Sequence, residues 1–166
     1  LSARLAYRHD AQVSDGATQA FARARAGEFE PLPGGNPTFG FQDGAYWFYL
    51  QVVNRNPEDL RWLLVQEYPL SDQLDLYVRY RDGRVLHQAG GDHVPFEMRY
   101  IRYRHPNFQL DLPLGEPVEI LLRVRSQSSM QVPLMLYTPR ALAEIMRDAQ
   151  FSTGLYYGIL LALLFY

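Results

Sequence analysis

The sequence predicts an all-β fold, an antiparallel jelly-roll β-sandwich with one N-terminal helix and one C-terminal helix. Short segments of alternating apolar and polar residues recur along the chain, and turns rich in proline and glycine separate them. Apolar residues form 48 % of the 166 positions, which is enough for a substantial core. This composition also excludes intrinsic disorder, which requires low hydrophobicity and high net charge.

The N-terminal part is predicted to contain one strand and one helix. Residues 4–8 alternate as a strand does, and Ser14 is the expected N-cap of the helix that follows. The apolar positions of this helix are Ala17, Ala20, Phe21 and Ala24. Gly27 is the expected left-handed C-cap, and residues 31–35 (PLPGG) are predicted to form a turn.

Beyond this turn the hydrophobic period changes from 3.6 to 2, which is typical of strands. Residues 46–54 form the first such strand, and residues 73–81 form the clearest one, followed by an Asp-Gly hairpin signal. The side chains expected to point into the core are Tyr46, Phe48, Leu50 and Val52 in the first, and Leu74, Leu76, Val78 and Tyr80 in the second. Further strands are predicted at residues 62–66, 85–88, 107–112, 119–125 and 131–138.

The C-terminal segment is predicted to be helical. Pro139 is well suited to the first position of a helix, and residues 139–150 then connect the sandwich to residues 151–166. The last sixteen residues (FSTGLYYGILLALLFY) carry no charge and include twelve apolar or aromatic side chains. We expect the sandwich domain at residues 1–138, a connecting helix at residues 139–150, and the start of a transmembrane helix at residues 151–166. A buried C-terminal helix is the alternative.

Several functional classes are excluded or left without support. The chain has no cysteine, so disulfides, zinc–thiolate sites and cysteine nucleophiles are absent, and the net charge of −2 argues against a nucleic-acid partner. The sequence lacks a phosphate-binding glycine loop, HExxH and GxSxG. We therefore expect a binding domain and not an enzyme.

One predicted strand face combines aromatic rings with guanidinium groups. Its residues are Trp47, Tyr49, Tyr77, Arg79, Arg123 and Arg125. Aromatic rings stack on sugars, and guanidinium groups bind carboxylates through two parallel hydrogen bonds, so this face is a candidate site for a small ligand such as a carbohydrate. The alternative is a face packed against the second sheet or against the helix of residues 14–26, with arginines at its rim.

The loop at residues 54–59 (NRNPED) concentrates oxygen-bearing side chains. Calcium prefers such ligands, and Asn56, Glu58 and Asp59 are the candidate metal ligands, with Asn54 beside them. The spacing is not that of an EF-hand. A solvated turn held by Asx hydrogen bonds is the alternative.

A second loop, residues 100–105 (YIRYRH), alternates tyrosine and arginine after Arg99. Such a loop is expected at the rim of a binding cleft, or as a docking surface for a partner subunit or for lipid headgroups.

Three stretches together resemble one family. They are residues 45–54 (AYWFYLQVVN), 60–78 (LRWLLVQEYPLSDQLDLYV) and 112–142 (LPLGEPVEILLRVRSQSSMQVPLMLYTPRAL). They are similar to the type-2 periplasmic domain of bacterial seven-transmembrane receptors with diverse intracellular signalling modules, which include RetS/LadS-like hybrid histidine kinases.

The resemblance implies that residues 1–138 are a sensor domain in the periplasm, a jelly-roll sandwich like those of carbohydrate-binding modules. It further implies attachment to the inner membrane and no catalytic residues. It also implies a two-component signalling output of the kind that controls biofilm formation, with a homodimer or an association with a related sensor as the assembly. The ligand is expected to be a carbohydrate or Ca²⁺. A carbohydrate-binding module without signalling, on a membrane-anchored surface protein, is the alternative function.

Overall fold

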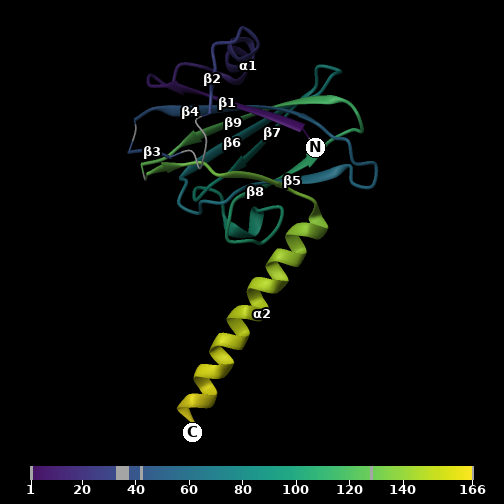
Figure 1. Cartoon of the computed structure of the whole chain (residues 1–166). Helices are drawn as coiled ribbons and strands as arrows, with labels where there is room; N and C mark the ends of the chain where they lie inside the picture. The colour runs from purple at the N-terminus through teal and green to yellow at the C-terminus, as the bar shows by residue number, and fades with distance from the viewer. Residues whose placement is uncertain (1, 33–37, 42, 128, 166) are drawn as a thin grey trace.

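The structure is a computed structural model of the chain, and it describes residues 2–32, 38–41, 43–127 and 129–165. Two layers of antiparallel strands face one another, a short helix lies on the outside of one layer, and a long helix extends from the other (Figure 1). The antiparallel sandwich with a C-terminal helix is therefore confirmed. Neighbouring strands within each sheet pair in antiparallel orientation.

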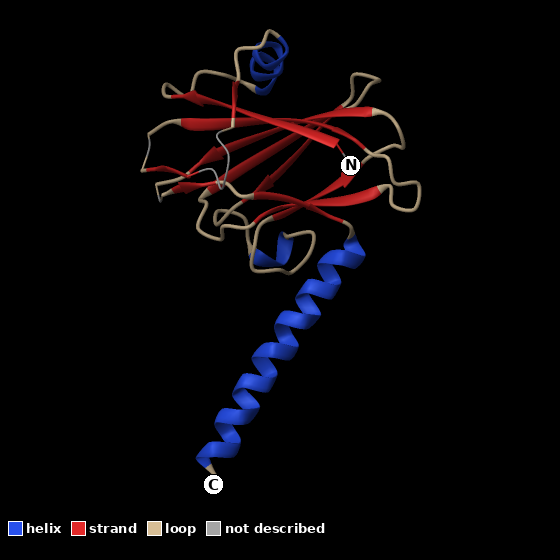
Figure 2. Ribbon diagram, in the orientation of Figure 1, coloured by secondary structure: helices blue, strands red, loops and turns tan. Residues whose placement is uncertain are grey.

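The larger layer is a six-stranded sheet (Figure 2). In spatial order its strands are β2 (Glu30–Pro31), β1 (Ser2–Asp10), β4 (Ala45–Val53), β9 (Pro117–Arg125), β6 (Gln73–Arg79) and β7 (Val85–Gly90). The predicted inward residues of β4 and β6 are buried in the core, including Phe48 and Leu76, because alternate side chains point to the same face.

The smaller layer is a three-stranded sheet, accompanied by a two-stranded ribbon. The sheet contains β11 (Leu134–Tyr137), β5 (Arg61–Gln66) and β8 (Asn107–Asp111), and the ribbon pairs β10 (Met130–Gln131) with β3 (Thr38–Gly40). Leu64 and Phe108 from this layer meet Phe48, Leu76 and Ile120 from the larger sheet. This apolar layer between the sheets is the main core.

The prediction of a single last strand at residues 131–138 is wrong in one respect. The structure divides it into β10 and β11, with Pro133 between them. Proline has no N–H to donate to a ladder, so the chain leaves its pairing with β3 and joins β5 beyond this residue.

Helix α1 (Ala17–Arg25) begins later than predicted. Its N-cap is Gly16 and not Ser14, because the backbone N–H and hydroxyl of Ser14 both donate to the Asp10 carboxylate. The Gln19 side chain instead accepts from the Gly16 N–H at 2.7 Å. The C-cap is Ala26, and Gly27, the predicted C-cap, follows it with the expected left-handed backbone at a φ of +78°. The predicted turn at residues 31–35 lies mostly outside the described residues.

Helix α2 (Pro139–Leu164) is continuous through residues 150 and 151, where the predicted connecting helix and apolar tail meet. The Thr138 hydroxyl caps it by accepting from the Ala141 N–H at 3.2 Å. Leu142 inserts between Leu63 and Val65 on the outside of the smaller sheet. Within the part of the chain that the structure describes, no helix meets the length and apolarity that crossing a membrane requires.

Candidate functional site

The six residues of the predicted ligand face all lie on the outer face of the six-stranded sheet. The strand register pairs Trp47 with Arg123, and Arg125 with Gln73. Tyr49 and Tyr77 lie on either side of Leu121 in the next row. The face is divided, however, because α1 covers its middle (Figure 1).

Trp47 lies beneath α1 and is only 1 % exposed. It packs with Ala20 and Phe21 of the helix and with Leu121 of β9, and the Arg123 guanidinium lies 5.5 Å from the centre of its ring. Its ring surfaces are thus occupied by the protein itself. For Trp47 the structure therefore shows the alternative in which this face packs against the N-terminal helix.

Tyr77 also has its ring engaged. It stacks on His87 with ring centres 4.6 Å apart, and the His87 Nε2 lies 2.9 Å from the Asp75 carboxylate. Burial raises the pKa of the Tyr77 hydroxyl, and the negative charge of Asp75 raises it further. Tyr77 and Arg123 therefore take part in an internal network, while Tyr49, Arg79 and Arg125 border open hollows.

Tyr49 and Arg79 line a hollow of about 460 Å³, called the outer hollow below, which also includes Arg25, Gln51, Arg81 and Glu119. The Tyr49 hydroxyl donates to Glu119 Oε1 at 2.8 Å, and the Arg25 Nε donates to the same oxygen at 2.9 Å. Arg25 makes a second contact to Glu119 Oε2. This clasp joins the end of α1 to strand β9.

The Glu119 clasp predicts a pH dependence of stability. Burial raises the pKa of Glu119, but the hydrogen bonds from Arg25 and Tyr49 and the charges of Arg25 and Arg79 outweigh it, so the net pKa lies below the ordinary 4.5. A lowered folded-state pKa stabilises the fold above about pH 4.5, and this contribution is lost as the pH falls through the folded value. We expect Glu119→Gln to remove that part of the acid sensitivity, measured by urea denaturation between pH 7 and 3. Equal acid sensitivity of the two proteins would contradict this.

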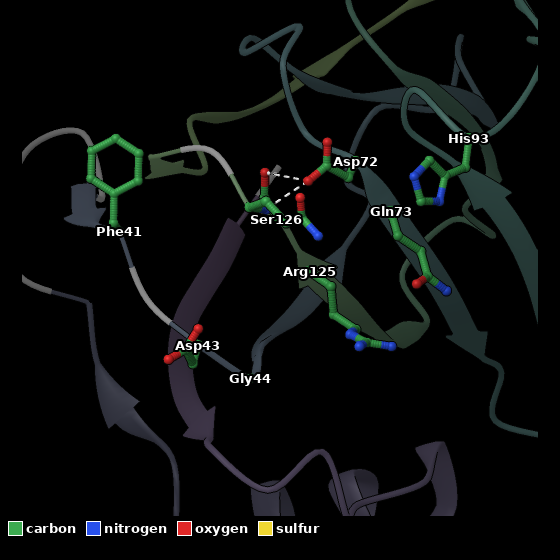
Figure 3. A pocket seen from close by; sticks show the side chains of 9 residues that line it. Phe41, Asp43, Gly44, Asp72, Gln73, His93, Arg125 and Ser126 are labelled. Carbon is green, nitrogen blue, oxygen red and sulfur yellow. Dashed lines mark hydrogen bonds between the residues drawn. The ribbon is translucent and has the colours of Figure 1, made fainter.

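A second hollow, of about 840 Å³, lies at one end of the sandwich. Figure 3 shows this hollow, called the end pocket below. The residues that line it include Phe41, Asp43, Asp72, Gln73, Arg125 and Gln127. Phe41 is 80 % exposed, and Arg125 at the end of β9 is the cross-strand neighbour of Gln73 at the start of β6. The pocket thus combines an open aromatic ring with carboxylate, amide and guanidinium groups, a set that suits a polyhydroxylated ligand.

One wall of the end pocket is held by Asp72. Its Oδ2 accepts from the Gln127 N–H at 2.6 Å and from the Ser126 hydroxyl at 3.2 Å (Figure 3). Sequence reasoning found only Arg125 among these residues. The others come from loops that are far apart in the sequence, and no spacing pattern connects them.

The loop at residues 54–59 is held by its own hydrogen bonds. The buried Asn54 amide donates to the carbonyls of Asp59 and Leu112 at 2.7 and 3.0 Å. The Asn56 amide donates to Asp59 Oδ2 at 3.0 Å, and its oxygen accepts from the Glu58 N–H. These are the Asx hydrogen bonds expected for a solvated turn, which was the alternative to a calcium site. No group of three or more His, Asp or Glu side chains within the described residues is placed to hold a metal ion.

The loop at residues 100–105 lies beside the root of α2. Ile101 and Tyr103 pack against the cluster of Leu63, Val65 and Leu142, while Arg102 and Arg104 are exposed. Asn107 fixes the loop by donating to the carbonyl oxygen of Ile101 at 2.8 Å. The loop therefore supports the first turns of α2, and its arginines face outward.

Comparison with known families identifies the chain. The family model described as 7TMR-DISM extracellular 2 matches residues 2–138, which is most of the chain. The chain belongs to this family. The 7TMR-DISM extracellular 2 domain lies outside the cytoplasm and is attached to a membrane receptor. The matched region includes both hollows and ends immediately before α2.

Comparisons with individual proteins add little. No curated protein matches the chain. A cupin 2 domain-containing protein from Halorhodospira halophila has 11 % identity over 92 % of this chain and 95 % of its own, with a TM-score of 0.22. At that score the likeness carries no argument about fold or function.

Proposed function

We propose that this 7TMR-DISM extracellular 2 domain is the periplasmic ligand-sensing input of a transmembrane receptor whose output is a hybrid histidine kinase. In this proposal the domain itself is not catalytic. A small saccharide binds in the end pocket, and α2 transmits the response toward the inner membrane. The observation that carries the proposal is the connection between the pocket wall and the root of α2.

This connection is short. Gln127, whose N–H is bound by Asp72, is followed by β10 and β11, and α2 begins twelve residues later at Pro139. A second route runs through β5, because the Gln66 side chain donates to Ser71 Oγ at 2.7 Å, next to Asp72, and to the Gln131 carbonyl at 3.0 Å. A ligand that shifts Asp72 and the 126–127 segment acts on β10, which continues through β11 into α2, and on β5, against which the root of α2 packs.

The chemistry of the end pocket favours a saccharide over calcium. The Phe41 ring is open for stacking, Asp43 offers acceptors for hydroxyl groups, and Arg125 and Gln127 offer donors. Two of the predicted calcium-binding oxygens, in contrast, are already hydrogen-bonded within their own loop, because Asn56 Oδ1 accepts from the Glu58 N–H and Asp59 Oδ2 accepts from the Asn56 amide. A cation would have to displace these bonds, so calcium is the less favoured ligand.

The position of α2 supports a role toward the membrane. From Phe151 onward the helix presents exposed apolar and aromatic side chains and no charge, so we propose residues 151–166 as the start of the first membrane helix. Gly154 and Gly158 lie one turn apart on this helix and permit close approach of another helix. Self-association or association with a related sensor is proposed through this segment.

The proposal is tested on the whole chain in detergent micelles. Neutral mono- and oligosaccharides are titrated by calorimetry, and amide hydrogen exchange of residues 139–150 is measured with and without the sugar that binds. We expect Arg125→Gln to weaken binding about tenfold or more, since a charge-assisted hydrogen bond is worth about 1.5–3 kcal/mol. Arg61→Gln, at an exposed arginine of β5, is the matched control.

Each outcome of this test is decisive. Sugar binding that slows exchange at the root of α2 supports the sensor. Binding without any change in α2 would replace it with a non-signalling carbohydrate-binding module. If no sugar of the panel binds and Ca²⁺ gives heat of binding instead, the assignment of a saccharide as the ligand is overturned.

A further inference from the structure

The outer hollow concentrates positive charge on a protein whose overall charge is negative. Three arginines, Arg25, Arg79 and Arg81, and one carboxylate, Glu119, line it, so its formal charge is +2 against −2 for the chain. The arginines come from the end of α1, the end of β6 and the turn that follows β6. Their convergence therefore results from the tertiary fold.

The only carboxylate that lines this hollow is already committed to other groups. Arg79 is the direct cross-strand partner of Glu119, but the Glu119 side chain is bound by Arg25 and by the Tyr49 hydroxyl. Within the described residues, neither Arg79 nor Arg81 forms an ion pair with any carboxylate. Two guanidinium groups are left with their forked donors available.

The Arg79 guanidinium is held in place by an aromatic ring and, among the described residues, not by an ion pair. It lies 5.7 Å from the centre of the Phe21 ring of α1, and its side chain is half-buried. Holding the side chain against an aromatic ring lowers the entropy that a ligand would have to overcome to order it. The Gln51 amide lies in the same row of the sheet, on the other side of Glu119, and adds a neutral hydrogen-bonding group.

We propose that the outer hollow is a second binding site, which takes an acidic saccharide by its carboxylate. The carboxylate of a uronic acid residue binds to Arg79 and Arg81, since the planar fork of arginine matches a carboxylate in two parallel hydrogen bonds. Gln51 contacts the hydroxyl groups of the ring. A volume of about 460 Å³ is within the usual range for a small-ligand site.

This site is distinct from the end pocket and is coupled to a different element. Phe21 and Arg25 belong to α1, so an anion bound by Arg79 lies at the junction between that helix and the sheet. The end pocket contains Arg125 and no residue of α1. The two sites are therefore separable by mutation.

The test uses the whole chain in micelles and trigalacturonic acid as the probe, with its methyl ester as the uncharged counterpart. We expect calorimetry to show binding of the acid, a loss of about tenfold or more in affinity for Arg79→Gln, and a similar direction of change for Arg81→Gln on the exposed turn. Arg61 lines neither hollow, so Arg61→Gln should leave the affinity unchanged. Raised salt should weaken binding, because the contact is ionic.

Three results would overturn the proposal. Equal binding of the acid and its ester would show that the carboxylate is not recognised. A loss confined to Arg125→Gln would place the acid in the end pocket, and equally effective competition by inorganic sulfate would make the outer hollow a general oxyanion site. Arg79→Gln is expected to fold, and a thermal midpoint like that of the wild type is checked first. Arg81→Gln lies outside the packed sheet and decides the question if Arg79→Gln does not fold.

Discussion

Replacing Trp47 with alanine is expected to lower the free energy of unfolding by about 3–5 kcal/mol, the usual cost of removing a large buried aromatic side chain. Trp47 is sealed between α1 and the six-stranded sheet, where Phe21 and Leu121 pack on it. Its loss leaves a cavity and removes the surface on which Arg123 rests. Urea denaturation followed by circular dichroism measures this change.

The matched control for Trp47 is Phe41→Ala. Phe41 is an aromatic residue that borders the end pocket and is largely exposed, so we expect its removal to change stability by less than about 0.5 kcal/mol. If Trp47→Ala denatures at the same urea concentration as the wild type, α1 does not seal the ring. The outer face would then be open for stacking on a ligand along its whole length.

Replacing Leu142 with alanine is expected to release the root of α2 at a cost of about 2–4 kcal/mol in local stability. Leu142 is 1 % exposed and is the residue by which α2 is buried against Leu63 and Val65. We expect amide hydrogen exchange to become faster in the first two turns of α2 and to stay nearly unchanged in the six-stranded sheet.

The control for Leu142 is Ile145→Ala on the same helix. Ile145 is 42 % exposed and is not part of the Leu142 cluster, so its truncation should leave the exchange of the first turns close to that of the wild type. Equal effects of the two variants would mean that helix propensity, and not the contact with β5, holds the root of α2. The proposed mechanical connection would then be lost.

The strands were predictable where one face of a sheet is buried. β4, β6 and β9 alternate in the sequence because alternate side chains enter the core, and the structure has their apolar faces where the period of two placed them. The start of α1 was less predictable. Ser14 has the chemistry of an N-cap, but Asp10, four residues earlier, competes successfully for its N–H.

The candidate sites were only partly predictable, and for a different reason. The alternation placed Trp47 and Tyr49 on one face, but it does not state which part of that face a helix covers. The end pocket and the Arg25–Glu119 clasp join residues up to 94 positions apart. Such contacts depend on the sheet order, which local patterns do not encode.

The continuity of α2 gives it the mechanics of a lever arm. A helix of 26 residues is about 39 Å long at 1.5 Å per residue. A tilt of about 5° at its root therefore displaces its far end by about 3 Å, more than half of the 5.4 Å helical pitch. A shift of a few tenths of an ångström at Leu142, too small to disturb the sandwich, is enough to reposition the apolar end of the helix against a neighbour.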